Sequence, residues 1–104
     1  MRATIKGLRY NTRTAKKIAA AQYHGSPADD EYWREILYRT PRAGHWFIWG
    51  EGGKASKFAY RADTYASWTG GERIFPLSEE EAFEWARDHM EDDELAQHFP
   101  DLVR

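Results

Sequence analysis

A short stretch of the chain concentrates side chains that bind nucleic acids and protein surfaces. They are Arg34, Tyr38, Arg39, Arg42, His45, Trp46 and Trp49. In single-stranded nucleic-acid platforms, bases stack on aromatic rings while Arg and Lys contact phosphates. Trp, Tyr and Arg also dominate the hot spots of protein interfaces. The residue types therefore suit either a compact aromatic core or a binding surface, and for a surface they leave open whether the partner is a nucleic acid or a protein.

A glycine-rich stretch follows and has only part of a phosphate-binding pattern. The P-loop pattern needs Gly at position 48 and Ser or Thr at position 55, where this chain has Ile48 and Ala55. Free backbone N–H groups beside Lys54 and Lys57 could bind an anion weakly, but a tight glycine turn is the favoured explanation. The candidate partner-binding residues in this part of the chain are Arg39, Arg42, Trp46, Trp49, Lys54 and Lys57.

No group of residues has the spacing of a catalytic or metal site. The chain has no cysteine, which excludes thiolate zinc ligands, a cysteine nucleophile and disulfides. Its four histidines are scattered, and no serine lies in a nucleophile-elbow sequence. The carboxylates of residues 79–84 are explained by helix capping rather than by paired acid–base chemistry. We therefore predict a protein that is not an enzyme and uses neither a cofactor nor a metal.

Charge is distributed unevenly along the chain. Residues 1–73 contain 13 Lys or Arg against 7 Asp or Glu, a balance of +6, whereas residues 74–104 contain 2 against 10, a balance of −8. The acidic part begins a predicted helix whose Glu79, Glu80 and Glu84 are further candidate partner-binding residues. Such a dipolar chain either screens its own charges or presents two faces that suit different partners.

The helices and strands predicted from the sequence form one α+β domain over residues 1–104, in the order β-α-β-β-β-α-α. A small antiparallel sheet has a β-hairpin at its centre and helices on one face. The expected elements are a strand over 4–10, a helix from Asn11 or Thr12 to Gln22, a hairpin of 35–40 with 45–49, a brief strand over 73–75 that Pro76 terminates at a sheet edge or end, a helix capped by Ser78 and Glu81, and a short helix from Asp92 that Pro100 ends.

Alternation along the second hairpin strand places Trp46 and Ile48 on one face and Phe47 and Trp49 on the other. Both faces are therefore aromatic, although the helices can cover only one. Two alternatives follow for the outer face. It either stays open as a binding platform or is covered by residues 54–72 as a second small core.

Composition predicts a location in the cytoplasm. A small secreted domain would usually carry disulfides, and the first seven residues contain no apolar segment of a signal peptide. The longest apolar run, residues 46–49, is too short to span a bilayer, so we expect no membrane contact.

Several motifs along the chain resemble a known group of proteins. They are Arg9-Tyr10-Asn11-Thr12, Leu37-Tyr38-Arg39-Thr40, Gly44-His45-Trp46-Phe47-Ile48-Trp49-Gly50-Glu51-Gly52-Gly53, Ser56-Lys57-Phe58-Ala59 and Ile74-Phe75-Pro76-Leu77-Ser78. Their order is similar to that in small, mostly uncharacterised proteins of phages, plasmids and conjugative elements. The resemblance covers nearly the whole chain, and no established activity of that group can be transferred.

The resemblance implies a habitat in which small binding proteins often inhibit host defence, as anti-CRISPR proteins do. It leads us to expect a non-catalytic inhibitor that blocks a CRISPR effector or another defence complex sterically in the host bacterial cytoplasm. The acidic helix would then meet a channel lined with Arg and Lys. The alternative is a nucleic-acid-binding accessory or regulatory protein that uses the basic, aromatic hairpin. A monomer and a homodimer are both compatible with either function.

Overall fold

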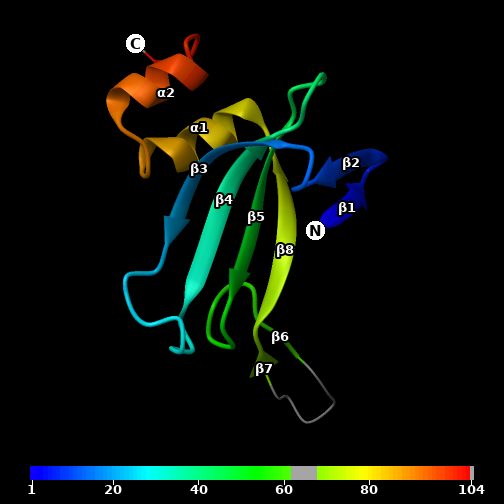
Figure 1. Cartoon of the computed structure of the whole chain (residues 1–104), viewed down its shortest axis with the longest axis vertical. Coiled ribbons are helices and arrows are strands. Elements are labelled where there is room, and N and C mark those ends of the chain that lie inside the picture. Colours follow the sequence, from blue (N-terminus) through cyan, green and yellow to red (C-terminus); the bar gives the residue numbers. More distant parts are fainter. Residues whose placement is uncertain (62–67, 104) are drawn as a thin grey trace.

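The computed structural model describes residues 1–61 and 68–103, and its centre is a four-stranded antiparallel sheet in the order β3-β4-β5-β8 (Figure 1). Its strands are β3 (Lys16–Gln22), β4 (Trp33–Arg39), β5 (Trp46–Gly52) and β8 (Gly71–Leu77). Two small hairpins flank it, β1 (Arg2–Ile5) with β2 (Leu8–Asn11) and β6 (Tyr60–Arg61) with β7 (Trp68–Thr69). The chain ends with α1 (Glu79–Arg87) and α2 (Asp92–His98). The predicted α+β class with antiparallel strands is confirmed.

The central hairpin is formed as predicted. Tyr38 pairs with Phe47 and Leu37 pairs with Ile48, so Trp46 and Phe47 point to opposite faces of the sheet. The turn is closed by the N–H of Thr40, which donates to the His45 carbonyl over 2.8 Å. Among the described residues no strand pairs with the outer side of β8, so the predicted edge position is confirmed. The prediction that Pro76 ends this strand is wrong, because β8 runs from Gly71 through Pro76 to Leu77, and an edge strand tolerates a proline that lacks a backbone N–H.

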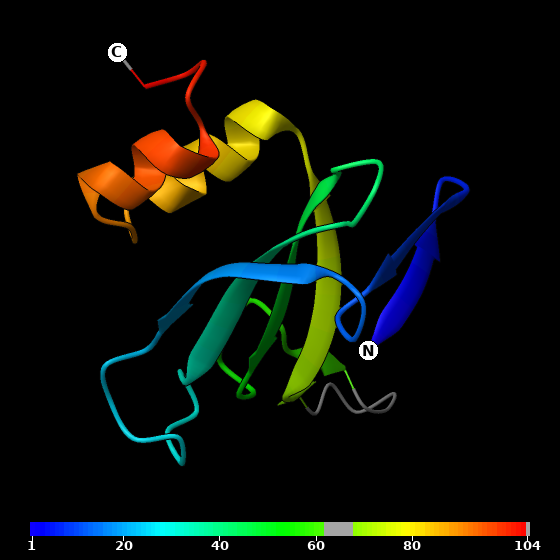
Figure 2. The same ribbon diagram turned by 45° about the horizontal axis from the view of Figure 1, so that its top comes forward.

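Both helices cover one face of the sheet, as predicted, near the end that carries the 40–45 turn (Figure 2). The capping box at α1 is present, since the N–H of Ser78 donates to Glu81 Oε1 over 2.9 Å and the N–H of Glu81 donates to Ser78 Oγ over 3.1 Å. The buried residues of this helix face are Leu37, Trp46, Ile48, Ala82, Ala86, Leu95 and Phe99. Among the described residues, no helix is long and apolar enough to cross a membrane.

The opposite face of the sheet has its own small core. It consists of Tyr10, Ile36, Phe47, Trp49 and Ile74, with Ala3, Ile5, Ala15 and Tyr38 packed against it. The cover is the β1–β2 hairpin, which the sequence interpretation treated as a single strand. The proposal that residues 54–72 cover this face is wrong where the chain is described, because Phe58 packs instead on the helix-covered face, next to Phe75. The same prediction included residues 62–67, which lie outside the described residues.

The predicted helix between residues 12 and 22 is wrong, and so is the predicted element order. Residues Lys16–Gln22 form β3, which pairs with β4 from Arg39 to Arg34 and carries an irregularity in register between Lys17 and Ala19. Ala, Lys and Gln favour helices only weakly, by tenths of a kcal/mol per residue. Pairing with the buried strand β4 outweighs that preference, and the bulge and lysines suit an exposed edge.

Gly50 is a position where the packing needs a glycine. The ring of Phe58 occupies the space that a Cβ at Gly50 would need. We expect Gly50→Ala to lower the free energy of unfolding by about 1–3 kcal/mol, because overpacking displaces the ring or the strand. Urea unfolding followed by circular dichroism measures the loss.

A double-mutant cycle with Phe58→Ala provides the control for this prediction. Removing the ring eliminates the overlap, so Gly50→Ala should cost less in the Phe58→Ala background than in the natural chain. Equal costs in both backgrounds would contradict the explanation by overlap.

Candidate nucleic-acid interface

A basic groove lies between the β1–β2 hairpin and the turn that joins β4 to β5. Its volume is about 1050 Å³. Its lining residues with hydrogen-bonding or charged side chains are Arg2, Thr4, Arg9, Tyr10, Asn11, Thr14, Thr40, Arg42 and His45. No Asp or Glu of the described residues belongs to this lining. The groove therefore has a positive local charge, although the whole chain has a net charge of −2.

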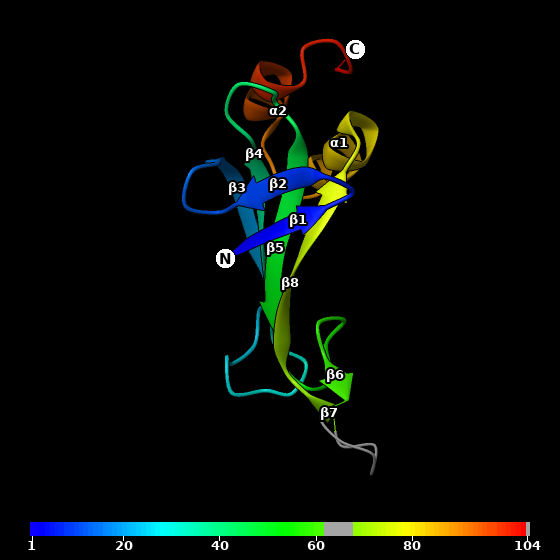
Figure 3. The ribbon, with the colours of Figure 1, turned by 90° about the vertical axis from the view of Figure 1, so that its right-hand side faces the viewer.

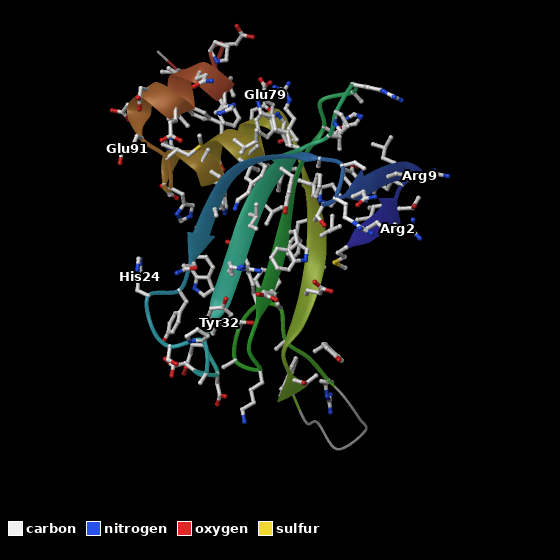
Figure 4. All side chains as sticks on the ribbon, viewed as in Figure 1. Arg2, Arg9, His24, Tyr32, Glu79 and Glu91 are labelled. Atoms are coloured by element: carbon white, nitrogen blue, oxygen red, sulfur yellow. The ribbon has the colours of Figure 1, made fainter. Side chains whose placement is uncertain are left out.

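The β1–β2 hairpin positions two of the arginines. Lys6 and Gly7 have φ angles of 50° and 80°, which is the type I′ geometry that fits the twist of two short strands. Thr4 pairs with Arg9 and Arg2 pairs with Asn11, so Arg2 and Arg9 share one face of the hairpin. Figure 4 shows Arg2 and Arg9 on this hairpin, well separated from Glu79 and Glu91 of the helical region.

The inner face of the same hairpin attaches it to the sheet. Tyr10 is 4% exposed, and its ring meets Phe47 edge to face at 5.3 Å. Tyr38 stacks on the same Phe47 ring at 5.2 Å. These three rings hold the hairpin against β4 and β5, and so they fix the distance between the two walls of the groove.

The 40–45 turn supplies the other wall. Arg42 adopts a φ of 62°, a left-handed conformation that residues other than glycine and asparagine rarely take. The turn is held from below by Arg39, whose Nε donates to the Gly44 carbonyl over 3.1 Å. The Arg39 guanidinium also lies 4.7 Å from the ring centre of Trp46. Arg39 therefore supports the turn, while Arg42 is exposed at the rim of the groove.

The two tryptophans predicted to contact a partner are both buried. Trp46 packs on the helix side, where it stacks on Phe99 at 4.7 Å. Trp49 lies on the other side, donates from Nε1 to Glu72 over 2.8 Å and lies under the Arg34 guanidinium. Neither ring has a free face of the kind that stacks on a base, so the aromatic platform expected on the hairpin is not formed.

The remaining predicted residues are spread over three other places. Lys54 lies 3.7 Å from Asp30 at the far end of the sheet, and Lys57 lies 2.7 Å from Glu35 on the helix-covered face. Glu79, Glu80 and Glu84 are exposed on α1. Of the residues singled out from the sequence, the structure brings only Arg42 into the lining of the groove, together with His45.

Arg2 and Arg9 were missed because the first segment was interpreted as one continuous strand. The signal that could have found them is the Lys6-Gly7 pair between Ile5 and Leu8, which is typical of a two-residue hairpin turn. With that turn, alternation places both arginines on the face turned away from Tyr10. Among the described residues, no three His, Asp or Glu side chains lie close enough to hold a metal ion.

Comparisons with known proteins add nothing to this geometry. No family model, no curated protein and no solved structure matches the chain.

Proposed function

We propose that this protein binds a nucleic acid through the basic groove and catalyses no reaction. The observation that carries the proposal is the lining of the groove, with three arginines and a histidine but no carboxylate. Most contacts between proteins and nucleic acids go to phosphate oxygens and are made by such side chains and by hydroxyl groups. Thr4, Thr14 and Thr40 supply hydroxyls in the same groove.

The backbone conformation of Arg42 supports this use of the turn. A left-handed conformation costs a residue with a Cβ about 1–2 kcal/mol, and a glycine would avoid that cost. Strained residues concentrate at functional sites. The strained arginine at the rim of a basic groove therefore supports a phosphate contact at this place.

Contacts to the phosphate backbone are favoured over contacts to bases. The aromatic side chains nearest the groove, Tyr10, Phe47 and Trp46, are all buried, so their ring faces cannot stack on bases. Binding should therefore depend little on sequence and strongly on salt. A duplex should compete at least as well as a single strand of equal length.

Fluorescence anisotropy with labelled 20-nucleotide single strands and duplexes tests the proposal. If Arg2, Arg9 and Arg42 each neutralise one phosphate, the logarithm of the duplex affinity should fall against the logarithm of the salt concentration with a slope of about −2.7. Arg9→Glu with Arg42→Glu should weaken binding about tenfold or more. Each single reversal, Arg9→Glu or Arg42→Glu, is matched by the control Lys54→Glu, which reverses one charge at the far end of the sheet, next to Asp30, and should have little effect.

The substitution Arg42→Gly distinguishes a loss of binding caused by the missing charge from one caused by loss of the fold. It relieves the left-handed conformation, so stability should be maintained or increased, while the salt slope should become less steep by about 0.9. Absence of binding at low salt would overturn the proposal. Equal losses for the groove variants and Lys54→Glu would show that only overall charge matters.

The second candidate function is the steric inhibitor of a host defence complex. The exposure of Glu79, Glu80 and Glu84 on α1 favours it, because an acidic helix complements a channel that normally holds nucleic acid. Changing the three residues to Gln should abolish recovery of such a complex from host lysate in the presence of nuclease. Recovery that disappears with nuclease alone would support the groove instead.

A further inference from the structure

A second pocket lies on the helix-covered face of the sheet, and the proposed function does not use it. It has a volume of about 450 Å³. It lies between α1 and the segment that carries Lys57, and Figure 3 shows α1 and the β6–β7 hairpin on the same side of the sheet. Its apolar lining comes from Ile48, Phe75, Leu77 and Trp85, and its charged lining comes from Glu35, Glu81, Glu84, Asp88 and Lys57. Four carboxylates therefore face one cation.

Glu35 is the buried member of this lining. Its side chain is only 7% exposed, with Lys57 Nζ 2.7 Å from Oε2 and Trp85 Nε1 donating to Oε1 over 3.3 Å. The Lys57 ammonium is the ion-pair partner of Oε2, so each oxygen of Glu35 has one partner. A carboxylate has about four acceptor positions, so Glu35 retains capacity for a further donor from the pocket.

Two carboxylates, Glu84 of α1 and Asp88 at its C-cap, are not explained by helix stability. Glu84 and Asp88 are four residues apart on one side of the helix, where like charges repel. Asp88 is the C-cap, at the end of the helix where the dipole favours cations. Among the described residues, neither of them forms an ion pair with Lys or Arg. Both face the pocket, which gives them a common role there.

We infer that this pocket binds an arginine side chain of a partner protein. Lys57 already lies near Glu35, with its Nζ 5.4 Å and 5.9 Å from the ring centres of Phe58 and Phe75, so Glu84 and Asp88 remain for an incoming cation. A guanidinium suits this arrangement better than an ammonium. Phe75 already has the Arg73 guanidinium 4.9 Å from its ring centre, so the ring for an incoming guanidinium is that of Trp85. A guanidinium can lie flat on this ring while its fork of N–H groups donates to two carboxylate oxygens.

This site is independent of the basic groove. The groove is built on the β1–β2 side of the sheet, whereas the pocket is built under α1 on the helix side. A nucleic acid in one therefore does not occupy the other. A basic protein partner would therefore bind at the acidic C-terminal part of the chain, whichever ligand the groove binds.

The test follows the indole N–H resonance of Trp85 by NMR, with Trp85→Phe to assign it. The probe is the peptide acetyl-Gly-Arg-Gly-amide, titrated to millimolar concentrations. Since Trp85 Nε1 donates to Glu35 inside the pocket, an arginine bound there should shift this resonance saturably. The comparison peptides replace Arg with citrulline, which has nearly the same shape without the charge, and with Lys. We expect no saturable shift with citrulline and weaker binding with Lys.

The variant Glu84→Gln with Asp88→Asn keeps the shape of the pocket and should weaken the Arg peptide about tenfold. The control variant Glu79→Gln with Glu80→Gln removes as much charge from the same helix outside the pocket and should have little effect. No saturable shift, equal shifts with Arg and citrulline, equal binding of Lys and Arg, or equal losses in both double variants would each overturn the inference.

Discussion

Trp46→Ala is expected to lower the free energy of unfolding by about 3–5 kcal/mol, the range found when a buried Phe or Trp becomes Ala. Trp46 is 3% exposed and lies between Phe99 of the C-terminal region and the guanidinium of Arg39. Removing the Trp46 ring would leave a cavity between the sheet and Phe99. It would also remove the ring that lies against Arg39, the residue that supports the 40–45 turn. Urea unfolding followed by far-ultraviolet circular dichroism measures the loss without depending on tryptophan fluorescence.

Trp68→Ala is the matched control. Trp68 is 54% exposed on β7, so the same substitution should change stability by no more than about 0.5 kcal/mol. The pair also tests the predicted role of Trp46 in partner binding. If Trp46→Ala reduced nucleic-acid affinity while stability stayed near that of the natural chain, Trp46 would be a contact residue and its assignment to the core would be wrong.

Local sequence signals account for the parts of the fold that were predicted correctly. The central hairpin is marked by two apolar strands around the Pro41–Gly44 turn, and α1 is marked by the Ser78 and Glu81 capping box. In each case the chemistry that forms the element lies within a few residues of it. Such features depend little on the rest of the chain.

Long-range pairing explains the parts that were missed. The composition of Lys16–Gln22 fits a helix, and only its pairing with β4 makes it a strand. The groove needs residues 2–11 to lie beside residues 40–45, which no local pattern encodes. That approach depends on the contact between Tyr10 and Phe47, two residues that are far apart along the chain.

The burial of Trp46 and Trp49 was not predictable from their types. Both residues have the chemistry of a binding surface and of a core, and the choice depends on which elements cover each face. The helices were predicted to cover one face, and this is confirmed. The cover of the other face was missed because the β1–β2 hairpin was not recognised, so the charge of the groove was assigned to the β4–β5 hairpin alone.

Phe47→Ala is expected to release the β1–β2 hairpin as well as destabilise the sheet by about 3–5 kcal/mol. Phe47 is fully buried between Tyr10 and Tyr38, and within the described part of the chain β1 and β2 pair with each other and with no other strand. A two-stranded hairpin is marginally stable by itself, so its packing on Phe47 must supply most of its order. Hydrogen exchange should show early loss of protection in residues 2–11, before the four-stranded sheet opens.

Loss of the hairpin should also remove one wall of the groove and weaken nucleic-acid binding. Phe83→Ala is the matched control, because Phe83 packs edge to face on Phe99 at 5.5 Å in the helical layer. That variant should lose stability while the hairpin keeps its protection and the groove keeps its affinity. If Phe47→Ala lost stability but residues 2–11 stayed protected and binding was unchanged, the groove would not depend on this cluster of rings. The attachment of the hairpin would then have to come from Ala3, Ile5 and Ile74.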